Sequence, residues 1–419
     1  MILTHALREQ MRKATRTLMS GGAATAAIQK ALKEMPTNLA SPLPPMPDFL
    51  RGMNTSRPNF GAGKAFGTTD AMPDFVKNLL GQLGVSSAEQ GWEIGEHMRS
   101  PQLEARATQP AEATVKNEGR FLNKSFTNQV GTRSYKLYIP SSYHGQAMPM
   151  VVMLHGCSQN PDDFANGTRM NLMAEEKQCF VVYPAQAQSA NSSKCWNWFK
   201  SVDQQREQGE PSIIAGITRE VVNNYKLDAD RVYVAGLSSG GAMAVIMATT
   251  YPDLYAAVGV HSGLPYASAR DLPSAFAAMR GSVQGIHAQA PRTSDSHSSS
   301  IPIIIFHGDS DTTVNVCNGE QLMKQNVRES TFVRCGGGDR MNPDVIVEQG
   351  RVPNGHRYTC TSHQDDDGQV LAEHWVIHGA GHAWAGGCSS GSYTDAKGPD
   401  ASREMLRFFY AQSQAMQKA

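Results

Sequence analysis

Short apolar runs alternate with longer helical patterns along the chain from about residue 119 onward. The runs are rich in Val, Ile and Phe, as buried strands are. They predict strands over Phe121–Asn128, Arg133–Ile139, Met150–Leu154, Phe180–Tyr183, Val232–Ala235, Ala256–Val260, Ile301–Phe306 and Val370–Ile377. Helical patterns between them predict helices over Asp162–Glu176, Pro211–Tyr225, Ser239–Thr250 and Asp400–Gln412. The alternation indicates an α/β fold with a mostly parallel central sheet, helices on both faces and an antiparallel hairpin at one edge.

The first third of the chain lacks this alternation. Residues 1–34 carry apolar side chains at helical spacing and predict a helical segment. Residues 35–117 contain a proline-rich stretch and predict a linker and peripheral extension, so the whole N-terminal part is expected to be helical or irregular. Residues 118–419 are the predicted catalytic domain. Within them, residues 266–300 leave the carboxyl edge of a strand and form a predicted cap-like insertion.

Charge and hydrophobicity narrow the choice of partner. Lys+Arg and Asp+Glu both number 38, which gives no basic surface for nucleic acid or an anionic membrane. No apolar run reaches the roughly 18 residues of a transmembrane helix. A small molecule is therefore the expected partner, and the sequence leaves the oligomeric state open.

The seven cysteines stand at 157, 179, 195, 317, 335, 360 and 388, and no pair has the C-x-x-C spacing of a zinc or redox site. The odd count leaves at least one unpaired, and Cys179, at the head of an apolar run, is the candidate for a buried free thiol. Heavy cysteine use favours an extracytoplasmic or secreted location. Residues 1–34, however, carry six Lys/Arg and two Glu and lack the apolar centre of a secretory signal, so a cytoplasmic location stays open.

The segment Gly236-Leu-Ser-Ser-Gly-Gly241 has the G-x-S-x-G pattern of a nucleophile elbow. A predicted strand precedes it and a predicted helix follows it. A turn this sharp leaves no room for side chains at the flanking glycines and exposes the central serine at the carboxyl edge of the sheet. Such a pattern also arises by chance in a chain with 38 glycines, but the strand and the helix favour Ser238 as a nucleophile.

An acid and a histidine follow Ser238 in the order that such a nucleophile requires. Asp311 lies in the loop after the strand that ends at Phe306, whereas Asp309 is still in the turn and is better explained as a turn-stabilising residue. His382 lies on a glycine-rich loop after the last strand. The histidines at 307, 374 and 378 lie within strands or at their ends and are expected to be structural.

An oxyanion hole needs two N–H donors, one from the residue after the nucleophile and one from the loop after an early strand. These criteria select the amides of Ser239 and Cys157. The Cys157 thiol is better used in a disulfide, for which Cys195 is a candidate partner. Three tryptophans near these motifs could line the substrate site or pack in the core: Trp196, Trp198 and Trp384.

These motifs together resemble the poly(3-hydroxybutyrate) depolymerase family of esterases. The resemblance rests on Leu154-His-Gly-Cys157, Cys195-Trp-Asn-Trp-Phe199, Gly209-Glu-Pro211, Gly236–Gly241, His307-Gly-x-x-Asp311, Gly381-His-Ala-Trp384 and Gly391-Ser-Tyr-Thr-Asp395 leading into Gly398-Pro-Asp400. It covers roughly residues 118–412. It implies an α/β-hydrolase fold, a Ser238–Asp311–His382 triad, and oxyanion donors at Cys157 and Ser239.

The resemblance implies ester hydrolysis without a metal or cofactor. The expected substrates are short-chain hydroxyalkanoate esters, their oligomers or polyester. A feruloyl or acetylxylan esterase is the enzymatic alternative, and a non-catalytic binding protein is the alternative of a different class. Two further disulfides are hypotheses within this framework: Cys317–Cys388, which would join the acid and histidine loops, and Cys335–Cys360.

Overall fold

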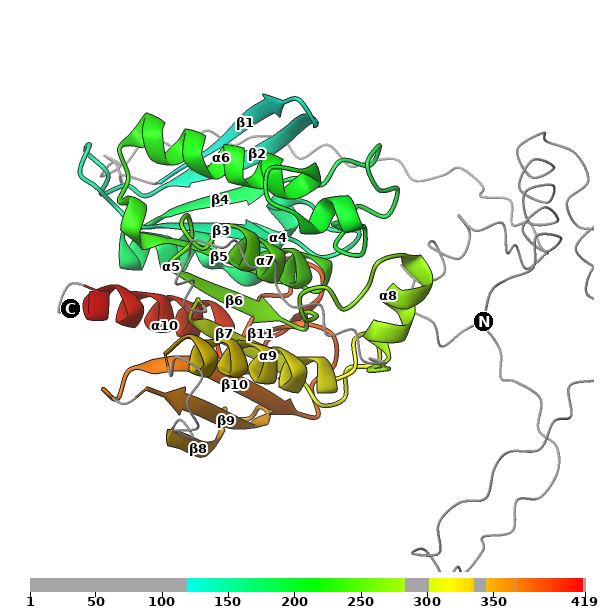
Figure 1. The fold of residues 1–419 in the computed structure, drawn as a ribbon. Helices are drawn as coiled ribbons and strands as arrows, with labels where there is room; N and C mark the ends of the chain where they lie inside the picture. Colours follow the sequence, from blue (N-terminus) through cyan, green and yellow to red (C-terminus); the bar gives the residue numbers. More distant parts are fainter. Residues whose placement is uncertain (1–118, 283–300, 335–343, 366, 417–419) are drawn as a thin grey trace, which may run out of the picture. The chain divides into compact units, whose positions relative to one another are not determined.

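A ten-stranded sheet organises residues 119–282, 301–334, 344–365 and 367–416, which are the residues that the computed structural model describes (Figure 1). The strand order is β1-β2-β4-β3-β5-β6-β7-β10-β9-β8. The strands are β1 (Arg120–Asn128), β2 (Gly131–Ile139), β3 (Met150–Leu154), β4 (Phe180–Pro184), β5 (Val232–Leu237), β6 (Ala257–His261), β7 (Ile303–Gly308), β8 (Asp344–Arg351), β9 (Arg357–Gln364) and β10 (Val370–His378). The six central strands from β4 to β10 pair in parallel, and antiparallel pairs flank them at both edges.

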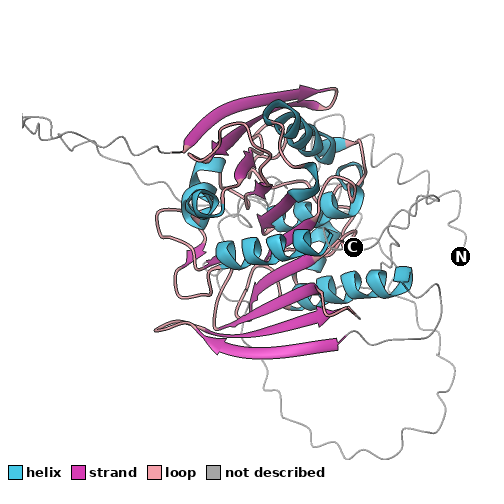
Figure 2. Ribbon diagram, turned by 90° about the vertical axis from the view of Figure 1, so that its left-hand side faces the viewer, coloured by secondary structure: helices cyan, strands magenta, loops and turns pink. Residues whose placement is uncertain are grey.

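Helices cover both faces of this sheet (Figures 1 and 2). Alternate residues of β3 and β5 enter two separate hydrophobic cores, one with Val152 and Val234, the other with Val151 and Tyr233. The longer helices are α4 (Pro161–Thr168), α5 (Met170–Lys177), α6 (Gly209–Tyr225), α7 (Ser239–Thr250), α8 (Leu272–Met279), α9 (Cys317–Arg334) and α10 (Ala401–Met416). Residues of α6, α7, α8 and α9 enter the first core, and residues of α4, α5 and α10 enter the second. None of the described helices is long and apolar enough to cross a membrane.

The predicted parallel sheet, its opening hairpin and all eight predicted strands are present, with ends that differ by two residues or fewer. The predicted helix over Asp162–Glu176 is instead two helices, because Arg169 has φ 54° and breaks the hydrogen-bonded pattern. The helices α8 and α9 and the hairpin β8–β9 were not predicted. The predicted segments 1–34 and 35–117 lie outside the described residues, as does the part of the 266–300 insertion after residue 282.

A sharp turn joins β5 to α7 at Ser238. Ser238 has φ 57° and ψ −119°, a conformation that residues with a side chain rarely adopt. A Cβ added to Gly236 would overlap the carbonyl of Gly240, and one added to Gly240 would overlap the carbonyls of Leu154 and His155. The backbone of the turn therefore packs directly against the end of β3, and both flanking positions require glycine, as predicted.

Three of the histidines buried in the sheet or at its carboxyl edge have a lowered pKa. His155 donates from Nδ1 to the Gly156 carbonyl (2.8 Å) and accepts at Nε2 from the Gln186 amide (3.1 Å). His261 accepts at Nε2 from the Ala385 amide (3.0 Å). Burial lowers the pKa of His155 to about 4, that of His261 to about 3 and that of His374 to about 4. These rings are therefore neutral structural groups near pH 7.

The turn predicts a sharp contrast between two glycine substitutions. Gly240→Ala should lower the free energy of unfolding by about 3 kcal/mol or more, because the new methyl group would overlap backbone carbonyls that cannot rotate away. Gly381→Ala is the matched control, since a Cβ there meets nothing within 4 Å. Urea unfolding of both variants measures the difference, and equal stabilities would contradict the packing described for the turn.

The buried histidines predict that stability falls with acidity. Below the ordinary histidine pKa of about 6.5, these histidines bind protons in the unfolded chain but not in the folded protein. Each of them therefore lowers the free energy of unfolding by about 1.4 kcal/mol for every pH unit below that value. Their contribution is complete above that pH and is lost as the pH falls towards the folded pKa values of about 3 to 4. Urea unfolding at pH 7.5, 6 and 5 measures the slope. His261→Gln should make it shallower by about one proton, and an unchanged slope would contradict the assignment.

Candidate active site

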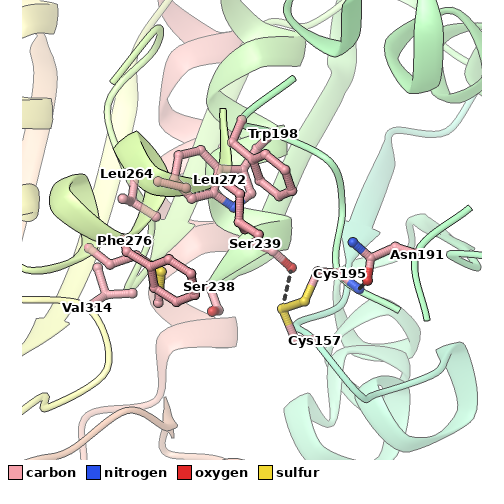
Figure 3. A pocket seen from close by; sticks show the side chains of 13 residues that line it. Cys157, Asn191, Cys195, Trp198, Ser238, Ser239, Leu264, Leu272, Phe276 and Val314 are labelled. Carbon is pink, nitrogen blue, oxygen red and sulfur yellow. Dashed lines mark hydrogen bonds between the residues drawn. A yellow bond between two sulfur atoms is a disulfide. The ribbon is translucent and has the colours of Figure 1, made fainter. Parts of the chain in front are cut away.

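Ser238 stands at the carboxyl edge of the sheet, at the base of a cleft. Its backbone N–H donates to the carbonyl of His261 at the end of the neighbouring strand β6 (2.9 Å). Its side chain helps to line the cleft, as does that of Ser239 (Figure 3). The serine is only 7% exposed, so a substrate reaches it through the cleft.

The structure brings the predicted acid and the predicted histidine together. They follow β7 and β10, which are neighbouring parallel strands, and the Asp311 Oδ2 to His382 Nδ1 distance is 2.7 Å. The other oxygen, Oδ1, accepts from the amides of Thr313 (2.8 Å) and Val314 (2.9 Å). With Nδ1 bound to the carboxylate, Nε2 of His382 is left for a second partner.

Asp311 is held as a carboxylate. Burial by itself raises its pKa, but hydrogen bonds from His307 and His382 and from the Val314 amide outweigh burial and hold the pKa well below its ordinary value. His307 Nε2 lies 3.5 Å from Asp311 Oδ2 and donates to the Val314 carbonyl (2.8 Å). At neutral pH the acid loop therefore carries a negative charge next to the imidazole of His382.

His261 connects the serine turn to the histidine loop. Its carbonyl accepts from Ser238, and its imidazole accepts from Ala385, three residues after His382. Val314, at the end of the acid loop, lines the same cleft as Ser238. The structure thus gathers all three predicted triad residues at one edge of the sheet, from the ends of β5, β7 and β10.

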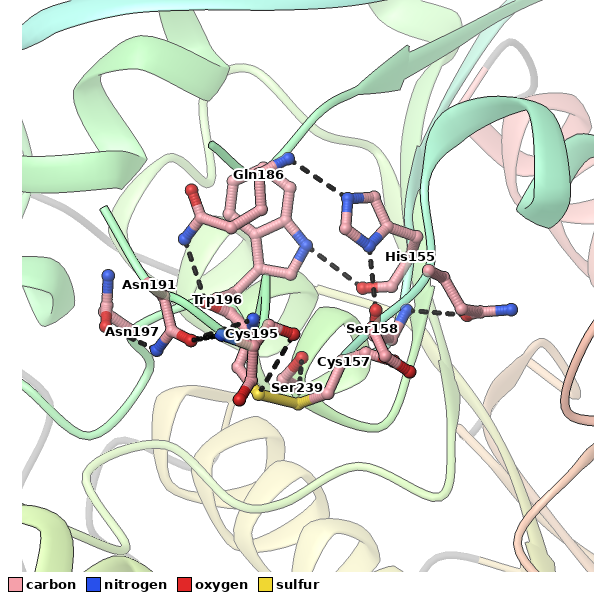
Figure 4. The surroundings of a disulfide bond; sticks show 12 residues. His155, Cys157, Ser158, Gln186, Asn191, Cys195, Trp196, Asn197 and Ser239 are labelled. Carbon is pink, nitrogen blue, oxygen red and sulfur yellow. Dashed lines mark hydrogen bonds between the residues drawn. A yellow bond between two sulfur atoms is a disulfide. The ribbon is translucent and has the colours of Figure 1, made fainter. Parts of the chain in front are cut away.

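The predicted oxyanion loop packs against the serine turn (Figure 4). A disulfide joins Cys157 to Cys195, with an S–S distance of 2.09 Å, as predicted. The Ser239 hydroxyl lies 3.4 Å from Cys157 Sγ, and because a disulfide sulfur carries no hydrogen, the hydroxyl is the donor. Among the described residues, the amides of Cys157 and Ser239 take part in no turn, loop or capping hydrogen bond, which leaves both available to a ligand.

Apolar side chains form most of the cleft wall. The cleft has about 450 Å³ of open space, part of it continuous with solvent. Helix α8 supplies one wall with Leu272, Phe276 and Met279, and Trp198 contributes from another loop (Figure 3). The cleft is therefore suited to a compact apolar group attached to the reacting atoms.

The other two predicted substrate-site tryptophans belong to the core. Trp196 is 1% exposed and donates from Nε1 to the His155 carbonyl (3.1 Å). Trp384 is also 1% exposed, stacks on His261 with ring centroids 5.3 Å apart and donates to Ser402. Neither lines the cleft, which corrects those two predictions.

The predicted Cys317–Cys388 bridge is wrong, because both residues are free thiols. Cys317 begins α9 and packs beside Gly281, whereas the amide of Cys388 donates to the carbonyl of Gly167 in the last turn of α4. Cys360 is a buried free thiol whose pKa burial raises to about 12, and its predicted partner at position 335 lies outside the described residues. Cys179 is buried and free, as predicted.

Two contributions to the site were not predicted. Gln159 accepts from the Gly156 amide (2.9 Å) and donates to Asp163 (2.9 Å), so it braces the oxyanion loop from outside the motif. The cleft helix α8 was missed inside the insertion, although Asp271 and Ser274 form a capping box that marks its start. That Asp-x-x-Ser pattern followed by apolar residues was the available signal.

Comparison with known proteins identifies the family to which about half of the chain is similar. The model of the family described as esterase PHB depolymerase matches residues 133–345, about half of the chain. Poly(3-hydroxyalkanoate) depolymerase C of Paucimonas lemoignei is 32% identical over 271 residues, which cover 61% of this chain and 59% of that protein. Poly(3-hydroxybutyrate) depolymerase of Ralstonia pickettii is 27% identical over 263 residues, which cover 59% and 50%. The chain thus spans between half and three fifths of the length of these curated relatives.

Other relatives are named as acetylxylan or feruloyl esterases. A probable acetylxylan esterase A of Aspergillus fumigatus is 30% identical over 188 residues, covering 45% of each chain. Among solved structures, acetyl xylan esterase from Aspergillus awamori aligns with a TM-score of 0.53 at 20% identity, covering 69% of this chain and 99% of that one. The structural likeness confirms the predicted α/β-hydrolase fold. With the family model matched over half of its length, the chain belongs to the PHB depolymerase family of esterases.

Proposed function

We propose that this chain is a serine esterase in which Ser238, His382 and Asp311 form the catalytic triad. The observation that carries the proposal is the 2.7 Å contact between His382 and Asp311 at the sheet edge where the strained serine turn ends. An ionised Asp311 fixes the Nδ1–H tautomer of His382, which makes Nε2 the basic nitrogen. Membership of an esterase family supports the same reaction.

The proposed reaction proceeds in two halves. His382 Nε2 removes the proton from Ser238 Oγ as Oγ attacks the ester carbonyl, and the resulting oxyanion accepts hydrogen bonds from the amides of Cys157 and Ser239. The imidazolium then gives its proton to the leaving alkoxide, the C–O bond breaks, and an acyl-enzyme remains. Water, deprotonated by the same imidazole, adds to the acyl carbon, and collapse of the second intermediate returns the proton to Ser238 and releases the acid.

The apolar cleft supports short-chain hydroxyalkanoate esters and their oligomers as substrates, with polyester as the extended form. Leu272, Phe276 and Met279 offer a wall for a small alkyl side group. The names of the depolymerases of Paucimonas lemoignei and Ralstonia pickettii favour the same class. The second candidate is an acetylxylan or feruloyl esterase, which the relative from Aspergillus fumigatus and a feruloyl esterase B of Neurospora crassa, 32% identical over 142 residues, favour.

The triad is tested with p-nitrophenyl butyrate. Ser238→Ala and His382→Ala should each lower kcat by on the order of 10⁴ to 10⁶, and Asp311→Asn by about 10⁴, because the three groups act as one unit. Ser142→Ala is the matched control, since its buried hydroxyl has no hydrogen-bond partner and lies in the loop before β3. Ser238→Ala with the rate of the wild type would rule out the proposed nucleophile.

The substrate class is tested by product analysis on three substrates at equal ester concentration. Hydroxybutyrate oligomers should be hydrolysed with the highest kcat/KM, ahead of acetylated xylan oligomers and a feruloylated sugar, because the cleft wall is apolar. Phe276→Ala should lower kcat/KM on the oligomers by about 10-fold, since it removes a wall of the cleft. Preferred release of acetate or ferulate would favour the second candidate instead.

A further inference from the structure

The acid loop holds the histidine loop through a second carboxylate, Asp309, which the proposed chemistry does not use. Asp309 Oδ1 accepts from the amide of Gly379 (2.7 Å), and Oδ2 lies 2.9 Å from Nδ1 of His378. The main chain adds two bonds, from Asp309 N–H to the Ile377 carbonyl (3.1 Å) and from Ser310 N–H to the Ala380 carbonyl (3.0 Å). One carboxylate therefore spans the two segments that carry Asp311 and His382.

His378 is fixed from its other side as well. Its Nε2 lies 2.9 Å from the Thr359 hydroxyl on β9, and its carbonyl accepts from Nδ1 of His356 (2.9 Å). His356 in turn contacts Asp395 through Nε2 (2.8 Å). The start of the histidine loop is thus held between the acid loop and the adjoining antiparallel strands.

Asp309 remains a carboxylate in this setting. Burial raises its pKa, but hydrogen bonds from the Gly379 amide and His378 outweigh burial and lower the pKa below its ordinary value. Its two oxygens can therefore accept both hydrogen bonds at neutral pH. The carboxylate is about one third exposed and is not part of the hydrophobic core. Its contacts therefore hold the loops together and do not contribute to core packing.

We propose that Asp309 is a positioning residue: by holding His378 and the Gly379 amide, it sets the path of the loop that brings His382 onto Asp311. The proposal rests on the proposed function, since it concerns the triad of that reaction. In this proposal, hydrogen bonds join the acid loop to the histidine loop. A Cys317–Cys388 disulfide had been expected to join them. Asp309 itself touches neither substrate nor the reacting atoms.

The test compares Asp309→Ala with Asp309→Asn in the full chain. Asparagine is the matched control, because its Oδ1 can accept from Gly379 and its amide can donate to the other tautomer of His378. Asp309→Ala should lower kcat on p-nitrophenyl butyrate by about 10- to 100-fold through misplacement of His382, with KM within about twofold because the cleft is untouched. Asp309→Asn should stay within about threefold of the wild-type kcat.

A second readout does not depend on turnover. The proton shared by His382 Nδ1 and Asp311 gives a far-downfield ¹H NMR resonance, which is assigned by its loss in His382→Ala. Asp309→Ala should shift or broaden this resonance, and Asp309→Asn should keep it. If the wild type hydrolyses no ester, the proposed function fails while the resonance still decides the role of Asp309.

The proposal is overturned if Asp309→Ala keeps both the kcat and the resonance of the wild type, or if Asp309→Asn falls as far as Asp309→Ala. Should Asp309→Ala not fold, as judged by circular dichroism, His378→Phe replaces it, since it removes one of the two contacts and keeps a ring of similar bulk. His378→Phe should lower kcat by a few-fold, roughly 3 to 10, and perturb the resonance. Wild-type values in both measurements would overturn the proposal.

Discussion

The site depends on one direct contact between backbone segments, where the serine turn packs against the end of β3. Gly240 lies against the carbonyls of Leu154 and His155, and Gly236 lies against Gly240, with no space for a side chain between them. Because of this contact, the oxyanion loop that follows His155 begins beside the helix that follows Ser238. The distance between the proposed nucleophile and its oxyanion donors is therefore set by backbone packing.

The buried ionisable groups around the serine turn differ in their charge. The buried histidines at 155 and 261 are neutral and hold neighbouring segments through hydrogen bonds. His155 lies at the start of the oxyanion loop, and His261 connects the serine turn to the histidine loop. Asp311 keeps its charge, because hydrogen bonds compensate its burial. The arrangement places the Asp311 carboxylate 2.7 Å from Nδ1 of His382, which is the requirement for a base of the proposed kind.

Local sequence pattern was sufficient to predict the repeating strands and helices and the turn that only glycine can form. The strand Met150–Leu154 could be predicted because a strand that is covered on both faces of the sheet consists of apolar residues. The glycines around Ser238 could be predicted because only glycine fits the turn. The order of Ser238, Asp311 and His382 was likewise visible. Several contacts between distant segments were not, because spacing gives no information on the direction in which a side chain points. Cys317 and Cys388 follow loops that meet, yet they leave on different elements, and Trp384 turns inward to stack on His261.

The placement of β10 has a consequence for biosynthesis. This strand comes late in the chain but inserts beside β7, and it delivers the histidine loop to a site whose serine was made about 140 residues earlier. A nascent or truncated chain that ends before β10 therefore contains the sequence of the serine turn and the oxyanion loop but lacks the proposed base, His382. Hydrolytic competence would arise only when the sheet closes around its last parallel strand. The strand order thereby links the assembly of the proposed triad to the completion of folding.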